Sequence, residues 1–220
     1  MEPEFWHERW HENRIGFHQS EVNRFLRRHC ARLAAAGGKG PIFVPLCGKS
    51  RDMVWLREQG HEVLGAELSP LAVEAFYKEA GWSATRRGRA EFLEYQGGGV
   101  TILLGNYFQL TPTLVGPISA VYDRAALIAL PSDTRKAYAT HMAELTPSGT
   151  PLLLIAPFSL KDPESGPPFV VSGDEVQGLF SAHFTVEVLE CERTTAAGSP
   201  NLIEQGLAWR EETTYLLTRR

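Results

Sequence analysis

The sequence contains few cysteines, no apolar run long enough to span a membrane, and no strong excess of either charge. Its 220 residues include three cysteines, Cys30, Cys47 and Cys191, an odd number without metal-type spacing,. Free thiols are typical of a reducing compartment rather than of a disulfide framework. The longest apolar runs have the length of a sheet strand, and no charged and apolar leader opens the chain. We therefore expect a cytoplasmic protein that does not associate with membranes, and we predict no metal site.

The charge balance also excludes some function classes. With 22 Lys and Arg, 26 Asp and Glu, a net charge of −4 and 43% apolar residues, the chain fits neither a nucleic-acid binder that relies on bulk charge nor a disordered protein,. Two local basic groups, Arg24–Arg28 and Arg86–Arg89, are interpreted as solvated helix and loop surface. A chain of this length can bury a full central sheet between two helical layers, so we expect one domain over residues 1–220.

The glycine patterns of phosphate-binding loops are also missing. Residues Pro41–Ser50 read as a buried strand, a turn at Gly48 and the start of a helix,. The turn Leu46–Arg51 has only the first glycine of Gly-x-Gly-x-x-Gly, and Phe43 stands where a P-loop needs its upstream glycine. A pyrophosphate would therefore fit poorly at this turn.

A second strand follows within Gly60–Ser69 and ends at Glu67, nineteen positions after Gly48. In a doubly wound sheet this spacing places a carboxylate beside the glycine turn, where it can accept hydrogen bonds from both hydroxyls of a ribose. S-adenosylmethionine carries a ribose but no phosphate, and it is the remaining common ligand. The alternative is a tight turn in an ordinary α/β protein, with Glu67 solvated.

Helices and strands alternate along the chain. Helices are predicted at Glu4–Asn13, Glu21–Ala36, Arg51–Gln59, Leu71–Ala80, Ser132–Leu145 and Gly173–His183,. After the first two strands, further strands are predicted at Glu91–Tyr95, Val100–Leu104, Ile118–Asp123, Thr150–Pro157, Phe184–Cys191 and Trp209–Leu217,. The pattern indicates a Rossmann-like α/β fold of the class I methyltransferase type: a mostly parallel, seven-stranded sheet with helices on both faces and an antiparallel C-terminal hairpin.

Six collinear motifs then point to one family. They are Phe5–Trp10, Ile15–His18, Pro45–Ser50, Gly60–Gly65, Tyr122–Leu127 and Gly166–Phe169. In order and spacing the chain resembles the bacterial thiopurine S-methyltransferases. The resemblance implies a monomeric enzyme that moves the methyl group of S-adenosylmethionine to a small-molecule thiol and releases S-adenosylhomocysteine. It also implies an N-terminal helical cover, residues 1–36, and a lid completed by the Gly166–Phe169 loop.

By the same resemblance, the cofactor is contacted by Trp10, Leu46, Glu67 through the ribose, Asn106 and Tyr107 beside the adenine, and Arg124. Trp10 can also offer its ring to the sulfonium by cation–π contact. For Trp6, on the same helix face, packing is the favoured interpretation. Without the family, Asn106 and Tyr107 would be interpreted as a turn residue and a core aromatic.

Arg124 is the first candidate for a catalytic residue. Asp123 and Arg124 follow a predicted strand and are expected at its carboxyl edge, with a surface salt bridge as the alternative. The family places this arginine beside cofactor and substrate, where a fixed cation favours a thiolate over a thiol. Asp123 is predicted to orient it.

Further residues are assigned to the substrate side. The resemblance places Phe17 there, and His18 is a lesser candidate for proton handling, because a lone histidine is more often structural. Phe169 is predicted to form an aromatic wall. Cys47 is interpreted as a packing residue.

One position departs from the family pattern. Asn201 stands where a basic residue that reaches toward the thiopurine is expected. Small thiols and reduced selenium or tellurium species are therefore also credible acceptors, and halide or thiocyanate would suit a sibling methyltransferase. Two readings from other classes stay open: a nicotinamide-dependent oxidoreductase, which the missing glycines disfavour, and a cofactor-binding protein without transfer activity.

Overall fold

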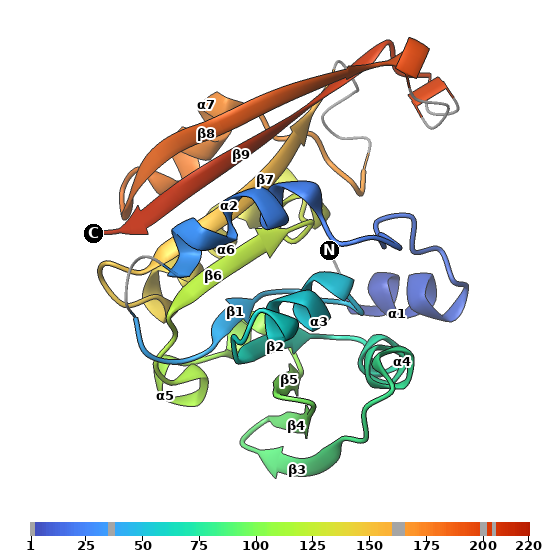
Figure 1. Ribbon diagram of the computed structural model, residues 1–220, viewed down its shortest axis with the longest axis vertical. Helices are drawn as coiled ribbons and strands as arrows, with labels where there is room; N and C mark the ends of the chain where they lie inside the picture. Colours follow the sequence, from blue (N-terminus) through green and yellow to red (C-terminus); the bar gives the residue numbers. More distant parts are fainter. Residues whose placement is uncertain (1–2, 35–37, 160–165, 199–201, 204–205) are drawn as a thin grey trace.

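One nine-stranded sheet forms the centre of the molecule (Figure 1). The computed structural model describes residues 3–34, 38–159, 166–198, 202–203 and 206–220. The strand order is β3-β4-β5-β2-β1-β6-β7-β9-β8. The five central strands are parallel, and they are β5 (Val100–Leu104), β2 (Val63–Glu67), β1 (Ile42–Val44), β6 (Ala120–Arg124) and β7 (Pro151–Phe158). Their carboxyl ends therefore meet at one edge of the sheet.

Antiparallel strands complete the sheet on both sides. At one side β9 (Trp209–Arg219) pairs with β7 and with β8 (Phe184–Thr195), which is the predicted C-terminal hairpin. At the other side β4 (Phe92–Gly97) and β3 (Thr85–Arg89) extend the sheet beyond β5.

The sheet therefore has nine strands, one more than the eight strand segments predicted from the sequence, and the expectation of a seven-stranded sheet is wrong. The strand that was not predicted from the sequence is β3. Its residues Thr-Arg-Arg-Gly-Arg are mostly exposed and show no alternation of apolar and polar side chains. The group Arg86–Arg89 is thus an edge strand and not a loop. An edge strand needs no apolar face, and its charges discourage pairing with a further chain.

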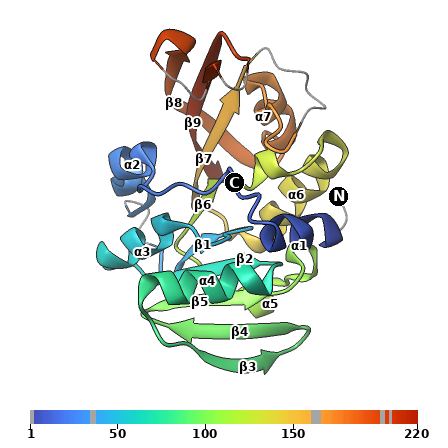
Figure 2. The same ribbon diagram turned by 90° about the vertical axis from the view of Figure 1, so that its right-hand side faces the viewer.

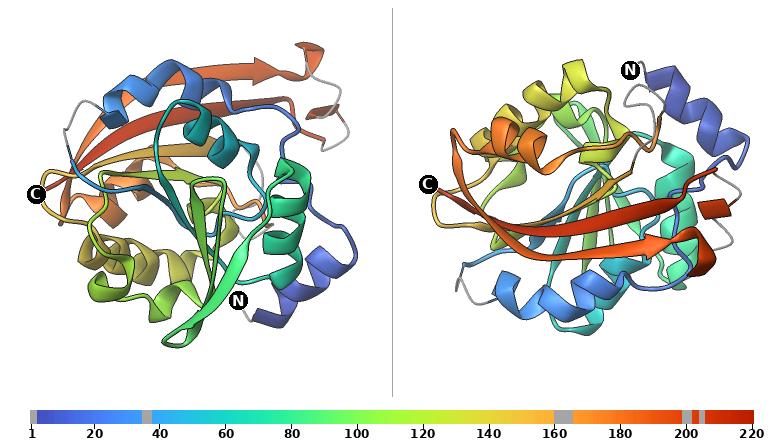
Figure 3. Two further views of the ribbon diagram at one scale, coloured as in Figure 1. Left: turned by 60° about the horizontal axis from the view of Figure 1, so that its bottom comes forward. Right: turned by 90° about the horizontal axis from the view of Figure 1, so that it is seen from above.

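Helices cover both faces of the sheet (Figure 3). One layer contains α2 (Arg24–Ala34), α3 (Arg51–Glu58) and α4 (Pro70–Ala80), and the other contains α5 (Pro112–Val115), α6 (Ser132–Leu145) and α7 (Gly173–Phe180). Successive residues of a strand serve opposite layers: Phe43 packs in the core beneath α6, whereas Ile42 and Val44 pack beneath α2 and α3,. Among the described residues, no helix is long and apolar enough to cross a membrane.

The N-terminal segment divides into two parts with different positions. Helix α1 (Pro3–His11) lies beside α4 at the carboxyl edge of the central strands (Figure 2). Helix α2 instead packs against β6 and β7, with Phe25 and Leu26 in the core. Of the cover expected from residues 1–36, the part that lies over the carboxyl edge is thus α1 and the loop after it.

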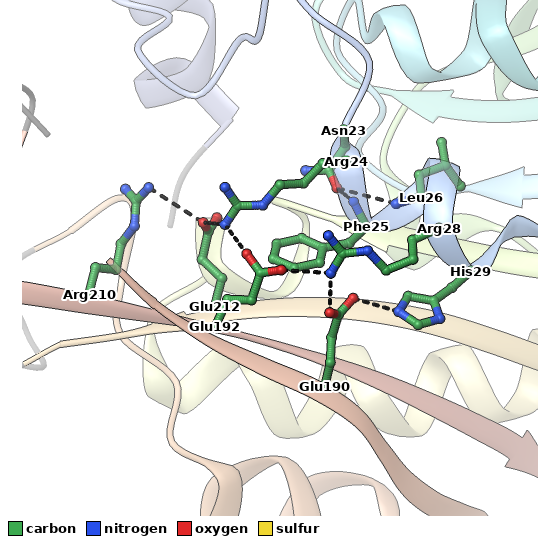
Figure 4. A network of polar contacts seen from close by, with 10 residues as sticks. All are labelled: Asn23, Arg24, Phe25, Leu26, Arg28, His29, Glu190, Glu192, Arg210 and Glu212. Atoms are coloured by element: carbon green, nitrogen blue, oxygen red, sulfur yellow. Dashed lines mark hydrogen bonds and ion pairs between the residues drawn. The ribbon is translucent and has the colours of Figure 1, made fainter. Parts of the chain in front are cut away.

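Charged side chains join α2 to the C-terminal hairpin (Figure 4). Arg24 contacts Glu192 and Glu212, each at 3.1 Å, and Arg28 contacts Glu190 and Glu192. The imidazole of His29 lies 2.6 Å from Glu190. This set of side chains, named here the α2–hairpin cluster, fixes the long hairpin to the body of the molecule.

Candidate active site

A cavity of about 320 Å³ opens at the carboxyl ends of the central strands. Its lining comes from α1, the loop after it, the ends of four strands and two later turns. The lining residues are Pro3, Trp6, Trp10, Phe17, His18, Val44, Leu46, Cys47, Gly48, Lys49, Ser50, Glu67, Leu68, Asn106, Tyr107, Phe108, Tyr122, Arg124, Ala125, Ile128, Ala129, Leu130, Pro167 and Pro168. This is the place where ligands bind in an open α/β sheet.

The turn between β1 and α3 forms the floor of the cavity. Leu46 and Gly48 both have left-handed backbones, with φ of +46° and +54°. A Cβ on Gly48 would lie 3.3 Å from the ring of Trp10, so the bare backbone lets the indole lie close above the turn,. Ser50 ends the turn by capping α3, its hydroxyl accepting a hydrogen bond from the Asp52 amide at 3.2 Å,.

Glu67 joins this turn to the end of β2. Its buried carboxylate accepts hydrogen bonds from the amides of Gly48 and Ser69, each at 2.7 Å. Burial raises the pKa of Glu67, and the backbone hydrogen bonds oppose that rise. Since a carboxylate oxygen can accept more than one hydrogen bond, Glu67 keeps acceptor capacity for a ribose.

An aromatic cluster covers the same floor from the N-terminal segment. The ring of Phe17 lies edge-on to Trp10 at 5.7 Å and to Trp6 at 5.9 Å between centroids. All three side chains are half-buried and line the cavity. Trp6, expected to serve packing, therefore lies in the site as well.

Asn106 and Tyr107 follow β5, the strand predicted to precede them. The Asn106 side chain caps the short helix η1 (Tyr107–Gln109) by accepting from the Phe108 amide at 3.0 Å. The Tyr107 ring is buried against Tyr138, 4.9 Å between centroids, while its neighbour Phe108 is exposed at the cavity mouth. Asn106 and Tyr107 are thus a turn residue and a core aromatic that also line the cavity, and their contact with a cofactor stays a prediction.

Arg124 ends β6 and turns its half-buried side chain to the cavity. Among the described residues it has no carboxylate partner within 4.0 Å, whereas the cavity's other cation, Lys49, pairs with Glu79 at 2.6 Å. The surface salt bridge weighed for Arg124 is therefore not found in this part of the chain. Its guanidinium is available to a ligand.

Asp123 does not line the cavity. Its buried carboxylate accepts from the amides of Ala126 and Leu127 at 3.2 Å and from the hydroxyl of Tyr138 at 2.7 Å. Because neighbouring strand residues point to opposite faces, Asp123 cannot orient the Arg124 guanidinium directly. It holds the turn that follows Arg124 instead, and burial raises its pKa to about 6.

Two other titratable groups line the cavity without being suited to base catalysis. Burial, followed by the positive charges of Lys49 and Arg124, lowers the pKa of His18. Burial raises the pKa of the Cys47 thiol well above its usual value, which agrees with a packing role,.

The loop of Gly166–Phe169 reaches the cavity through its prolines. Pro167 and Pro168 line it, whereas the Phe169 ring is buried outside the lining, beside Arg135. The aromatic wall expected from Phe169 is therefore a proline wall. Asn201 lies outside the described residues.

Several lining residues were not found from the sequence. Phe108 adjoins a predicted site residue, and Ile128, Ala129 and Leu130 form the turn after Arg124. Their position in the sequence could have indicated them, because each follows the carboxyl end of a predicted parallel strand. Pro167 and Pro168 belong to the motif Gly166–Phe169. The sequence of that motif does not show which of its side chains faces the cavity.

The fold is shared with known methyltransferases. A 1,6-didemethyltoxoflavin-N1-methyltransferase from Burkholderia thailandensis, crystallised with S-adenosylhomocysteine, is similar with a TM-score of 0.63 at 15% identity, over 99% of this chain and 87% of that one. A magnesium protoporphyrin IX methyltransferase from Synechocystis gives 0.63 at 15% identity, over 97% and 98%. The predicted class I methyltransferase fold is confirmed.

Sequence relatives are much more similar. Thiopurine S-methyltransferases from Shewanella amazonensis and Methylococcus capsulatus are each 44% identical to this chain; the first covers 100% of both chains, the second 99% of this chain and 97% of the relative. The sequence model of the family described as thiopurine S-methyltransferase (TPMT) matches residues 1–220. The resemblance drawn from the six motifs is confirmed, and the chain belongs to the thiopurine S-methyltransferase family.

Proposed function

We propose that the protein transfers the methyl group of S-adenosylmethionine to the sulfur of an aromatic or heterocyclic thiol, thiopurines included, and releases S-adenosylhomocysteine. The relatives' activity supports this assignment. The observation that carries it in the site is Arg124, a cation without a carboxylate partner among the described residues, at the edge of a largely apolar cavity beside the Gly48–Glu67 turn.

The cavity suits this cofactor at its floor. Glu67 offers a carboxylate for the ribose hydroxyls, and the bare backbone at Gly48 leaves room beneath Trp10. The remaining contacts are proposed for Leu46, for Asn106 and Tyr107 beside the adenine, and for Arg124. A bound S-adenosylmethionine supplies an activated methyl group on a sulfonium. The aromatic face of Trp10 would stabilise that positive charge.

The acceptor side is apolar and flat. Phe17, Trp6, Ile128, Pro167 and Pro168 give it walls without carboxylates. Such walls fit a planar ring and exclude water from the reacting atoms. Phe169 supports this wall from behind rather than forming it.

The site favours an acceptor that is already ionised. Glu67 is engaged with two amides, Asp123 lies outside the lining, and the pKa of His18 is lowered. Arg124 then stabilises a thiolate whose proton has gone to solvent, and the sulfur lone pair forms the new bond to the methyl carbon as the carbon–sulfonium bond breaks. Alignment of the three atoms supplies most of the catalysis.

We further propose that the enzyme acts as a monomer of one domain in the cytoplasm. All nine strands join one sheet, and the lining residues come from elements along the chain from α1 to the Pro167–Pro168 loop, which supports one domain. Cys30, Cys47 and Cys191 are free thiols, as in a reducing compartment,. Sedimentation equilibrium at micromolar concentration tests the monomer, and a dimer mass would contradict it.

The experiment is transfer of labelled methyl to 6-mercaptopurine and thiophenols, with calorimetric binding of S-adenosylhomocysteine. Arg124→Ala is expected to lower kcat/KM for thiols by about 10²–10³-fold while the cofactor product still binds. Arg27→Ala is the matched control, because Arg27 is exposed on α2 and does not line the cavity. Cofactor binding with transfer only to selenium, tellurium or halide species would reassign the acceptor, and absence of cofactor binding would refute the proposal.

A further inference from the structure

Arg135 is a fully buried arginine in the layer behind the cavity. It lies on α6 and does not line the cavity itself. Its Nε donates to the carbonyl of Leu130 at 2.9 Å, and one terminal nitrogen donates to the carbonyl of Val170 at 3.4 Å and to the carboxylate of Glu175. A buried guanidinium is costly to desolvate, so each of these partners is needed.

The two carbonyls belong to the two walls of the acceptor side. Leu130 ends the turn Ile128–Leu130, and Val170 follows the prolines Pro167 and Pro168. A backbone hydrogen bond from the Phe169 amide to the Ile128 carbonyl, at 2.8 Å, joins the same segments. The guanidinium carbon of Arg135 also lies 5.6 Å from the centre of the Phe169 ring.

We infer that Arg135 is a positioning residue that sets the width of the acceptor side of the cavity. It joins the Ile128–Leu130 turn to the segment that follows the proline wall, and Glu175 on α7 holds its charge in place. The planar fork of arginine fixes both carbonyls at once, which a lysine cannot do. This inference rests on the proposed function, because it assigns the walls to an acceptor.

The test compares acceptors of two sizes in Arg135→Lys. For a planar aromatic thiol that touches both walls, KM is expected to rise about tenfold, since a wall displaced by a fraction of an ångström loses its contacts. For a small alkanethiol, KM is expected to stay within about twofold, as is the affinity for S-adenosylhomocysteine. A role in stability alone would affect both acceptors equally.

Arg219 provides a matched control. It also donates to backbone carbonyls, those of Ala143 at 2.9 Å, His183 at 3.1 Å and Arg220 at 3.0 Å, and it lies over the ring of Phe184. Its neighbour Thr218 pairs with Pro151, the first residue of β7, so Arg219 lies at the edge of the sheet opposite to the cavity. Arg219→Lys should leave the KM values of both acceptors unchanged.

Three further measurements apply if Arg135→Lys is poorly folded or if thiols are not turned over. Glu175→Gln keeps Arg135 and should shift the aromatic thiol's KM in the same direction by a smaller factor. Hydrogen exchange of residues 167–172 should be faster in Arg135→Lys than in the wild type, and unchanged in Arg219→Lys. Equilibrium binding of the two thiols in the presence of S-adenosylhomocysteine gives the same comparison without turnover.

Three results would overturn the role of Arg135. They are an equal rise in KM for the aromatic and the small thiol, equal effects of Arg135→Lys and Arg219→Lys, and failure of the wild type to bind any thiol. Normal selectivity of Arg135→Lys would do so as well. If the wild type binds thiols but does not methylate them, the proposed function fails, while a tenfold selective loss of aromatic thiol binding in Arg135→Lys would still support the positioning role.

Discussion

At the scale of single residues, Gly48 couples the floor of the cavity to the aromatic cover. Its amide binds Glu67, its φ is +54°, and a Cβ would lie 3.3 Å from Trp10. We predict that Gly48→Ala weakens binding of S-adenosylhomocysteine by about tenfold, because the indole of Trp10 must move,. The left-handed backbone at this position also costs roughly 1–2 kcal/mol of stability in the variant. Isothermal calorimetry measures the affinity.

Gly60→Ala separates the two causes. Gly60 also has a positive φ, +91°, but a Cβ there would meet no atom within 4 Å. This variant should lose stability from backbone strain and keep the cofactor affinity of the wild type. Equal loss of affinity in both variants would show that strain, and not the contact with Trp10, weakens binding.

His18 gives a second prediction at this scale. Burial and the charges of Lys49 and Arg124 lower its pKa, so its imidazole is neutral and weakly basic near pH 7,. We predict that the acidic limb of kcat/KM follows the pKa of the acceptor thiol, moving by about two units between thiols whose pKa values differ by about two units. The pH–rate profile of His18→Gln should keep the same inflection. An inflection that stays fixed across acceptors and is lost in His18→Gln would identify His18 as a base.

At the scale of elements, the α2–hairpin cluster shows how an exposed hairpin is held. Arg28 contacts two carboxylates, and its hydrogen bonds with Glu192 and Glu190 raise its pKa. The hydrogen bond from Arg28 and the charge of Arg24 lower the pKa of Glu192. Single exposed ion pairs contribute little, but carboxylates shared between α2 and β8 make the effect collective.

We predict that Glu190→Gln lowers the melting temperature by about 2 °C at low salt, because it weakens the contacts with Arg28 and His29,. The difference from the wild type should shrink in 1 M NaCl, where exposed charges about 3 Å apart are screened. Glu58→Gln is the control, since Glu58 is exposed on α3 and has no ion pair among the described residues. A decrease in the melting temperature of Glu190→Gln that does not depend on salt would mean that the substitution acts through packing.

The same elements show what the sequence could predict. The central strands were placed within a few residues because most of their residues are apolar and buried,. Strand β8 runs on to Thr195, four residues past its predicted end, because pairing with β9 holds a segment that is polar on both faces. Pairing between strands is a long-range property, so neither this extension nor β3 could be read from local composition.

At the scale of the whole molecule, the position of the site was predictable from the sequence, but the direction in which each side chain points was not. The sequence places Arg124, Glu67 and Asn106 at the carboxyl ends of strands, and the structure brings all three to one cavity. Asp123 was assigned to the site by its place at a strand end and Phe169 by the family motif, yet both side chains are buried outside the cavity. Which side a side chain faces depends on strand alternation and on partners far along the chain, such as Tyr138 and Arg135.

Asp123 also links the site to the stability of the whole fold. Its carboxyl is buried, and its pKa is raised from 3.8 to about 6. Between these two values the unfolded chain releases the proton and the folded chain keeps it, so this group contributes a loss of stability as pH rises from about 4 to 6. Above about pH 7 the penalty is constant, at roughly 3 kcal/mol for a shift of about two units,.

We therefore predict that Asp123→Asn becomes progressively more stable relative to the wild type as pH rises from 4 to 7, because the amide cannot ionise. Its oxygen still accepts from the amides of Ala126 and Leu127, so the turn after Arg124 is kept. Tyr138→Phe should act in the opposite direction, since loss of the hydrogen bond from Tyr138 raises the pKa of Asp123 further. Urea unfolding at several pH values gives both differences. A stability difference between Asp123→Asn and the wild type that does not change with pH would mean that Asp123 ionises normally in the folded protein, and its partners would then have to outweigh its burial.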